Sequence, residues 1–271
     1  GVKLLMDKYR KGAEVDIAGS DACLNQQVEF GYEWMGIAKY VFGSSTIVQK
    51  KGLNYRALLD WFAKHPLFET AKAAAQIPVI YGNSVSVNGS GRTYSSYRDP
   101  AATMATWTVA ELGSLKWAME ELATELSEWL DEPTSKIERL DRLTEMKALV
   151  AKGERFGNVS YDLHTFLLIL NTWARENLEN QAGQRFASIN DRINSVQDTL
   201  NKSVLSKYIG EKYQKGLLRT SKGVAIWLPA TPFEFKEMFP KFLRGKFYSN
   251  ELGSGSSQWS KFVEHFSGSP R

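Results

Sequence analysis

The single cysteine of the sequence stands where a nucleophile would be well positioned, between a predicted strand and a predicted helix. Residues 15–19 (VDIAG) are apolar with a β-branched start and predict a strand, and residues 25–38 carry apolar side chains at helical spacing. Cys23 is therefore expected beyond the carboxyl end of a strand, where parallel α/β sheets bind ligands. A helix N-terminus there would favour the nucleophilic thiolate. The alternative is a buried structural thiol, because free cysteine also packs as a small apolar side chain.

A cysteine nucleophile needs a base that takes its proton and donors that stabilise the oxyanion. The backbone N–H of Cys23 can supply one donor, and the base is expected to be one of three histidines. His65 precedes a proline at a predicted helix end, where it is expected to bind the last carbonyl groups. His164 lies among apolar residues and is expected to be a core residue, whereas His265 lies in the last predicted helix. None of the three stands in a glycine-flanked motif after a strand.

Composition excludes several classes of protein. Apolar residues make up 43% and charged residues 24% of the 271 residues, as in ordinary soluble globular proteins. The net charge of +4 is spread along the chain, which gives little support to nucleic-acid binding. No run of 18 apolar residues is present that would span a membrane. One cysteine cannot form an internal disulfide.

The order of the predicted elements indicates an α/β fold in two regions. Strands are expected at residues 15–19, 39–43, 78–81 or 85–87, 103–109 and 223–228. Helices are expected at residues 25–38, 55–64, 67–76, 113–130, 135–152, 161–177, 185–208 and 259–266. We expect an α/β core in residues 1–112, and a helical subdomain with a final core strand (223–229) in residues 113–271. A sheet that began with residues 15–19 would leave that strand as an exposed edge, so we expect further strands on a segment N-terminal to Gly1.

The segment 21–24 (DACL) and its downstream spacing resemble the clostripain-like cysteine peptidases, which share a clan with caspases, gingipains and legumains. Glu29, Tyr32 and the strand-like residues 40–45 continue the similarity. It extends through Gly52 and Tyr55, and more weakly through residues 106–126 and 223–229.

This resemblance implies a caspase-like fold, with a mostly parallel sheet flanked by helices. It also implies an autocatalytically processed precursor, of which this chain resembles the heavy chain. A separate N-terminal light chain would complete the sheet and carry the dyad histidine, followed by glycine, and the second oxyanion donor. The implied activity is an endopeptidase that cleaves after Arg or Lys through a Cys–His dyad. The implied location is the outside or the envelope of a bacterial cell. No cofactor is expected, although some family members require calcium.

Within that resemblance, Asp21 lies at the base of the specificity pocket and pairs with Arg or Lys of the substrate, while Ala22, Ser44 and Ser45 line the pocket. A buried carboxylate that binds a guanidinium bidentately is a sound physical basis for such a preference. The alternative is that Asp21 is a turn or cap residue beside a helix start. One departure weakens the basic preference: where the family often has a second acid in a Gly-Asp-Gly turn, this sequence has residues 50–52 (KKG).

Two other functions remain alternatives. The first is a catalytically degenerate caspase-like domain that is retained for binding or scaffolding. A His-Gly segment after an upstream strand would favour the enzyme, and its absence would favour the scaffold. The second is a flavodoxin-like binding module, which is disfavoured because residues 19–22 (GSDA) lack the glycine spacing of a phosphate loop.

Overall fold

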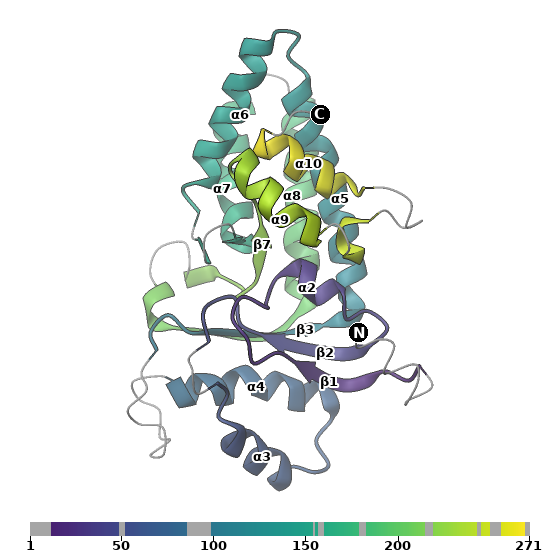
Figure 1. Cartoon of the computed structure of the whole chain (residues 1–271), viewed down its shortest axis with the longest axis vertical. Helices are drawn as coiled ribbons and strands as arrows, with labels where there is room; N and C mark the ends of the chain where they lie inside the picture. The colour runs from purple at the N-terminus through teal and green to yellow at the C-terminus, as the bar shows by residue number, and fades with distance from the viewer. Residues whose placement is uncertain are drawn as a thin grey trace. The chain divides into compact units, whose positions relative to one another are not determined.

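The computed structural model describes residues 12–48, 52–85, 99–153, 155–156, 160–178, 183–214, 219–242, 245–249 and 256–268. The chain divides into two compact units (Figure 1). Unit 1 comprises residues 1–112 and 202–225, and unit 2 comprises residues 113–201 and 226–271. Residues 202–225 join unit 1 because they contain a strand of its sheet.

The sheet of unit 1 has four strands in the order β1-β2-β3-β6. The strands are β1 (Val15–Gly19), β2 (Ala38–Gly43), β3 (Thr103–Thr108) and β6 (Val204–Ile209). β1 and β2 are parallel, whereas β3 is antiparallel to both of its neighbours. The four described strands therefore form a mixed sheet, whereas the resemblance implied a mostly parallel sheet that a light chain completes. Among the described residues, β1 lies at the end of the strand order, with β2 as its neighbour.

Helices cover both faces of this sheet because successive side chains of a strand point to opposite sides. Thr106 of β3 donates its hydroxyl to the carbonyl of Ala74 in α4 (Thr70–Val85), at 3.2 Å. The next residue, Trp107, faces α2 (Val28–Tyr32), where a Cβ on Gly31 would lie 2.8 Å from the indole Nε1. Figure 1 shows α4 and α2 on opposite sides of the strands.

On the α4 side, the apolar core also includes the loop before α3 (Tyr55–Lys64) and α3 itself. Its buried members are Leu53, Leu58, Ile77, Tyr81, Val85, Ala102 and Met104. The helix predicted at residues 55–64 is confirmed.

The strand predicted at residues 78–81 is wrong, because residues 70–85 form the single helix α4 even though it contains Pro78. Of the alternative at residues 85–87, only Val85 is described, and it ends the helix. Ala74, Ile77, Tyr81 and Val85 recur every three or four residues and are all buried. Burial of this helical stripe outweighs the β-forming character of residues 77–81. Residues 86–87 lie outside the described residues.

Two predicted helices are shorter than expected. The one at residues 25–38 is α2, which has only five residues and continues into turns as far as residue 37. The one at residues 185–208 ends at Ser203, and the next six residues form β6. Pairing of β6 with β3 decides this boundary, which depends on a partner distant in sequence.

Unit 2 is mainly helical. Its helices are α5 (Leu112–Asp131), α6 (Lys136–Val150), α7 (Leu163–Leu178), α8 (Gly183–Ser203), α9 (Pro232–Phe242) and α10 (Gln258–Ser267). A small sheet is formed by β4 (Arg155–Phe156), β5 (Ser160–Asp162) and β7 (Ala225–Trp227). The predictions for α5, α6, α10 and β7 are confirmed to within a few residues. The helix predicted at residues 161–177 begins at Leu163, because Asp162 belongs to β5 and accepts the backbone N–H of Thr165.

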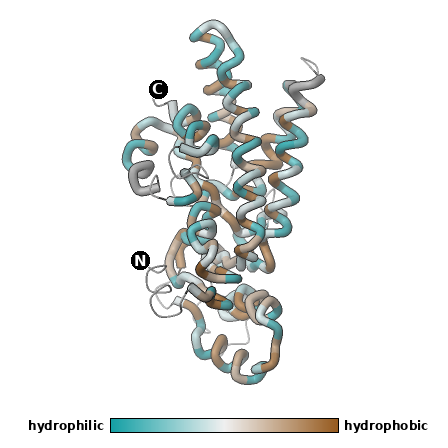
Figure 2. The backbone as a smooth tube through the Cα atoms, turned by 90° about the vertical axis from the view of Figure 1, so that its right-hand side faces the viewer, coloured by the Kyte–Doolittle hydropathy of each residue, from teal (hydrophilic) through white to brown (hydrophobic). Residues whose placement is uncertain are grey.

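The long helices of unit 2 alternate between hydrophilic and hydrophobic residues (Figure 2), as expected for helices with one buried stripe. On α5, the predicted core stripe is confirmed as buried: Leu115, Met119, Leu122, Leu126 and Trp129. Trp129 packs edge-to-face on Trp173 of α7, with ring centroids 4.8 Å apart. No helix among the described residues is long and apolar enough to cross a membrane.

Candidate active site

The parallel strands β1 and β2 end at the same edge of the sheet, and the predicted site residues follow them. Asp21 and Cys23 come after β1, and Ser44 and Ser45 come directly after β2. The side chains of Asp21, Ala22 and Cys23 are exposed, whereas those of Ser44 and Ser45 are fully buried. The edge therefore presents a carboxylate and a thiol to solvent, above a layer of buried hydroxyl groups.

A sharp reversal of the chain carries Cys23. The backbone N–H of Ser20 donates to the carbonyl of Phe42 (3.1 Å), which extends the β1–β2 ladder. Beyond it, the N–H groups of Leu24 and Gln26 donate to the carbonyls of Thr46 (3.2 Å) and Ser44 (3.0 Å), so the chain now runs back along the same neighbour. Leu24 has a φ of 59°, the only positive value for a non-glycine residue in the described part of the chain. The reversal requires this left-handed residue directly after the cysteine.

The thiol of Cys23 is free and contacts the backbone of Val48. Its sulfur accepts the Val48 N–H at 3.3 Å and lies 3.7 Å from the Val48 carbonyl oxygen. The expected helix N-terminus does not adjoin it, because α2 starts at Val28 and is a single short turn. The sequence-based argument for a dipole-stabilised thiolate is therefore wrong.

The histidines do not complete a dyad through any hydrogen bond to Cys23 in the described residues. His65 in unit 1 lies with Nδ1 2.7 Å from the carbonyl oxygen of Trp61, so Nδ1 carries the proton, and its ring stacks on the Trp61 ring at 4.4 Å. The expectation that His65 binds a helix-end carbonyl is confirmed. His164 and His265 belong to unit 2, where the His265 Nε2 lies 3.8 Å from a carboxylate oxygen of Asp131.

Asp21 is anchored by its neighbours while it remains exposed. The backbone N–H of Leu53 lies 3.1 Å from Oδ1 and 3.2 Å from Oδ2, and the Tyr55 hydroxyl donates to Oδ2 at 2.7 Å. The hydrogen bond to Asp21 is the main reason that the pKa of Tyr55 is raised above its usual value. The expectation of a buried carboxylate was wrong, so an ion pair here would be weaker than a desolvated one.

Ser44 and Ser45 fix the chain beneath the exposed residues. The Ser44 hydroxyl donates to the Thr46 carbonyl (3.1 Å), and the Ser45 hydroxyl donates to the carbonyl of Gly223 (2.5 Å). The Thr103 hydroxyl accepts the backbone N–H of Ser45 at 3.1 Å. Thr103 and Gly223 were missed as supporting residues because their sequence surroundings carry no local motif. Tyr55 was part of the family resemblance, but nothing in the sequence indicated its contact with Asp21.

No group of three or more His, Cys, Asp or Glu side chains in the described residues is arranged to hold a metal ion. Lys51, which was expected to weaken basic selectivity, lies outside the described residues, so that prediction stays open.

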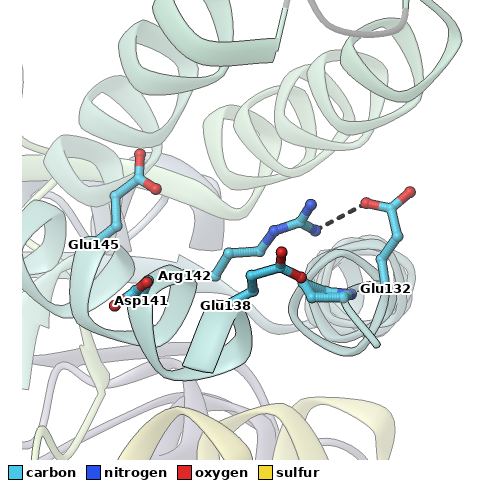
Figure 3. A pocket seen from close by; sticks show the side chains of 6 residues that line it. Glu132, Glu138, Asp141, Arg142 and Glu145 are labelled. Atoms are coloured by element: carbon cyan, nitrogen blue, oxygen red, sulfur yellow. Dashed lines mark hydrogen bonds and ion pairs between the residues drawn. The ribbon is translucent and has the colours of Figure 1, made fainter. Parts of the chain in front are cut away.

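Unit 2 has a surface cavity of about 400 Å³ that is lined by acidic residues of α6 and the preceding turn (Figure 3). Arg142 compensates this charge: it donates to Glu132 at 2.8 Å and stacks over Trp129. Glu145 accepts the indole N–H of Trp173 at 2.6 Å. These side chains therefore hold the helices together.

Comparison with known proteins identifies relatives of the whole arrangement. The family model described as "Clostripain family" matches residues 2–266. A solved B. fragilis cysteine protease is similar, with a TM-score of 0.57 at 15% identity, over 96% of this chain and 95% of that one. An inactive zymogen protease from Parabacteroides distasonis gives 0.55 at 16% identity, over 88% of this chain and 59% of that one.

A secreted cysteine protease from Bacteroides thetaiotaomicron, solved with an irreversible peptide inhibitor, gives a TM-score of 0.52 at 14% identity. The match covers 85% of this chain and 58% of that one. The present chain thus spans less than two thirds of two of these relatives and nearly all of the third. A comparison of the sequence with curated proteins found no match. At these identities, the solved structures show that the fold is shared.

Proposed function

Because the chain belongs to the clostripain family of cysteine proteases, we propose that it is an endopeptidase that cleaves after a basic residue with Cys23 as its nucleophile. The observation that carries this proposal is the joint exposure of Asp21 and Cys23 on one turn at the edge of the sheet. A carboxylate that binds the basic side chain of the substrate would hold the carbonyl group of that same residue, which belongs to the scissile bond, near the thiol sulfur. Such positioning accounts for a large part of the acceleration in covalent catalysis.

The chemistry proceeds in two displacements. A histidine takes the thiol proton, and the sulfur of Cys23 attacks the carbonyl carbon to form a tetrahedral oxyanion. The backbone N–H of Cys23 is one donor for that oxyanion. The C–N bond then breaks, the amine leaves with the proton from histidine, and a thioester remains on the sulfur. Water, deprotonated by the same histidine, hydrolyses the thioester and restores the thiol.

We propose that a light chain supplies this histidine and pairs with β1. Two observations support the proposal: β1 has a strand neighbour on one side only among the described residues, and His65 already donates Nδ1–H to its own helix. A companion strand would satisfy the unpaired backbone groups of β1. Denaturing gels of the native protein should reveal a smaller co-purifying chain with a His-Gly segment, produced by cleavage after a basic residue. Full activity of residues 1–271 alone would refute the requirement for a light chain.

We further propose that Ala22, Ser44 and Ser45 form a wall of the pocket around Asp21. Since the two serine side chains are buried, they would act by holding the backbone beneath Asp21 and Cys23 in place. The hydrogen bonds of their hydroxyl groups to Thr46 and Gly223 support such a positioning role.

The decisive test compares two substitutions in the processed protein. Cys23→Ala should lower peptide hydrolysis by at least about 10³-fold and abolish labelling by iodoacetamide, because the nucleophile is removed. Asp21→Asn keeps the shape and removes the charge, so it should lower kcat/KM for basic peptides about tenfold more than for neutral ones. A peptide library varied before the cut measures this selectivity. Undiminished hydrolysis by Cys23→Ala, or a preference for acidic residues, would contradict the proposal.

A degenerate domain that binds without cleaving is the second candidate. The contact of the Cys23 sulfur with Val48, and the lack of a histidine bonded to that sulfur among the described residues, favour it. An irreversible peptide inhibitor separates the two candidates. A mass increase on Cys23 indicates a competent thiol, whereas an unmodified chain in its native, assembled form supports binding alone.

We also propose that the protein is secreted or held at a bacterial cell envelope. The support is the described relative from B. thetaiotaomicron, which is a secreted protease. Fractionation of the native host with an antibody against the chain tests the location, and retention in the cytosol would contradict it.

A further inference from the structure

The carboxylate of Asp21 is partly occupied by donors of the chain itself. The backbone N–H of Leu53 lies almost equally far from its two oxygens, at 3.1 and 3.2 Å. A donor at equal distances from both oxygens lies at the open end of the carboxylate, between them. A guanidinium would need this same position in order to form its two parallel hydrogen bonds. The position between the two Asp21 oxygens, which a bidentate guanidinium would need, is therefore already occupied by the Leu53 N–H.

Tyr55 occupies a further acceptor position on the same group. Its hydroxyl donates to Oδ2 at 2.7 Å, and this bond is the main reason that the pKa of Tyr55 is raised. Gly52 lies against the same oxygen, because a Cβ at this position would be 2.2 Å from Oδ2. A carboxylate has about four lone-pair positions. In the part of the chain that the structure describes, the position that Tyr55, Leu53 and Gly52 leave open is the outer side of Oδ1.

We infer that Tyr55 and the Leu53 N–H restrict Asp21 to one outward acceptor, Oδ1, and that the pocket thereby selects lysine over arginine before the scissile bond. The lysine ammonium is a compact charge that needs one acceptor, whereas arginine loses the second bond of its planar fork. Tyr55 is thus a positioning residue that acts through Asp21. The inference rests on the proposed peptidase function and narrows its substrate class.

The hydroxyl of Tyr55 can be removed without disturbing the core, since the residue is 53% exposed. In Tyr55→Phe, the Asp21 carboxylate loses the bond that fixes its rotation about χ2. It can then turn both oxygens away from Leu53 and accept a guanidinium bidentately. Removal of this hydroxyl should therefore improve arginine substrates while lysine substrates change little.

The test uses the processed protein and two fluorogenic peptides that differ only in lysine or arginine before the cut. The wild type should show the higher kcat/KM for lysine. Tyr55→Phe should lower the lysine-to-arginine ratio about tenfold, which corresponds to one hydrogen bond of about 1.4 kcal/mol. Tyr40→Phe is the matched control: Tyr40 is half-buried in β2, pairs with Ile17 and Thr108, and should leave the ratio unchanged.

The outcomes separate this inference from the proposed function. Two outcomes overturn the inference alone, provided that Asp21→Asn still impairs basic substrates selectively. One is a wild-type preference for arginine, and the other is an equal lysine-to-arginine ratio of kcat/KM in Tyr55→Phe and Tyr40→Phe. If Asp21→Asn hydrolyses both basic peptides as well as the wild type does, the proposed function is overturned and the inference with it. The same conclusion follows if the wild type cleaves neither peptide. Since a purely structural role for Tyr55 would change both substrates alike, the ratio is the informative quantity.

Discussion

The edge of the unit 1 sheet and the helical interior of unit 2 are stabilised in different ways. At the edge, residues 20–26 and 44–48 are held by backbone hydrogen bonds and buried hydroxyl groups, and the reactive side chains face solvent. In unit 2, α5 presents a fully apolar stripe to its neighbours, with Trp129 packed on Trp173. Large-to-small changes should therefore affect the free energy of unfolding in unit 2, whereas changes at the edge should affect chemistry.

Backbone hydrogen bonding at the edge of the unit 1 sheet also stabilises a strained residue, Leu24. Leu24 adopts a left-handed conformation that costs a β-unbranched residue about 1 kcal/mol. Hydrogen bonds on both sides of it, from Leu24 to Thr46 and from Gln26 to Ser44, over-determine the turn. Strain of this kind is retained where a side chain must be presented in one direction, which here is the direction of Cys23.

The largest expected effect on stability lies in the interior of unit 2. Leu126 is fully buried on α5, so Leu126→Ala should lower the free energy of unfolding by about 2–5 kcal/mol through lost burial and a cavity. Leu140→Ala on α6 is the control, because that side chain is 52% exposed and should cost no more than about 0.5 kcal/mol. Urea titration followed by tryptophan fluorescence measures both. Equal losses in the two variants would contradict the contrast between interior and surface.

A second prediction concerns the edge and uses two glycines with the same backbone strain. Gly52 and Gly36 both have positive φ values, 65° and 73°. A Cβ at Gly52 would meet Asp21, whereas a Cβ at Gly36 would meet nothing within 4 Å. Each substitution to Ala should cost about 1 kcal/mol of stability through the left-handed conformation. Only Gly52→Ala should also displace Asp21 and lower kcat/KM for basic peptides, about tenfold.

The control for this pair is hydrolysis of a neutral peptide, which should respond equally weakly to both variants. If Gly36→Ala impaired basic substrates as strongly as Gly52→Ala, the close approach of Gly52 to Asp21 would have no functional consequence.

Sequence reasoning succeeded where structure depends on residues close together in the chain. The buried stripe of α5 and the span of α3 follow from helical spacing and from Asn54, whose side chain accepts the N–H of Ala57 at the helix start. The positions of Asp21 and Cys23 at the end of β1 follow from a short apolar run with small residues after it.

It failed where a distant partner decides the outcome. β6 pairs with β3 across about a hundred residues of sequence, and α4 stays helical through Pro78 because its apolar face packs on the sheet. The contacts of Asp21 with Leu53 and Tyr55 also join separate segments. The exposure of Asp21 and the burial of Ser44 and Ser45 depend on this tertiary arrangement, so residue type could not reveal them.

The smallest expected effect is a pH dependence inside unit 2, at a carboxylate that joins two of its helices. Glu120 of α5 accepts the backbone N–H groups of Gln258 and Trp259 at the start of α10. Burial raises its pKa, although those backbone bonds oppose the shift. The folded protein therefore holds this proton to a higher pH than the unfolded chain does. Since the folded state then binds more protons, stability falls as the pH rises from the unfolded value, near 4.3, through the folded one.

Glu120→Gln removes this titration and keeps an oxygen acceptor for the start of α10. The free energy of unfolding of the wild type, relative to this variant, should thus decline as the pH rises above the unfolded pKa and level off above the folded pKa. Urea titrations at four pH values measure the trend. A wild type that gains stability relative to Glu120→Gln as the pH rises would mean that the backbone N–H groups of α10 outweigh burial, and that this interior contact is electrostatically favourable.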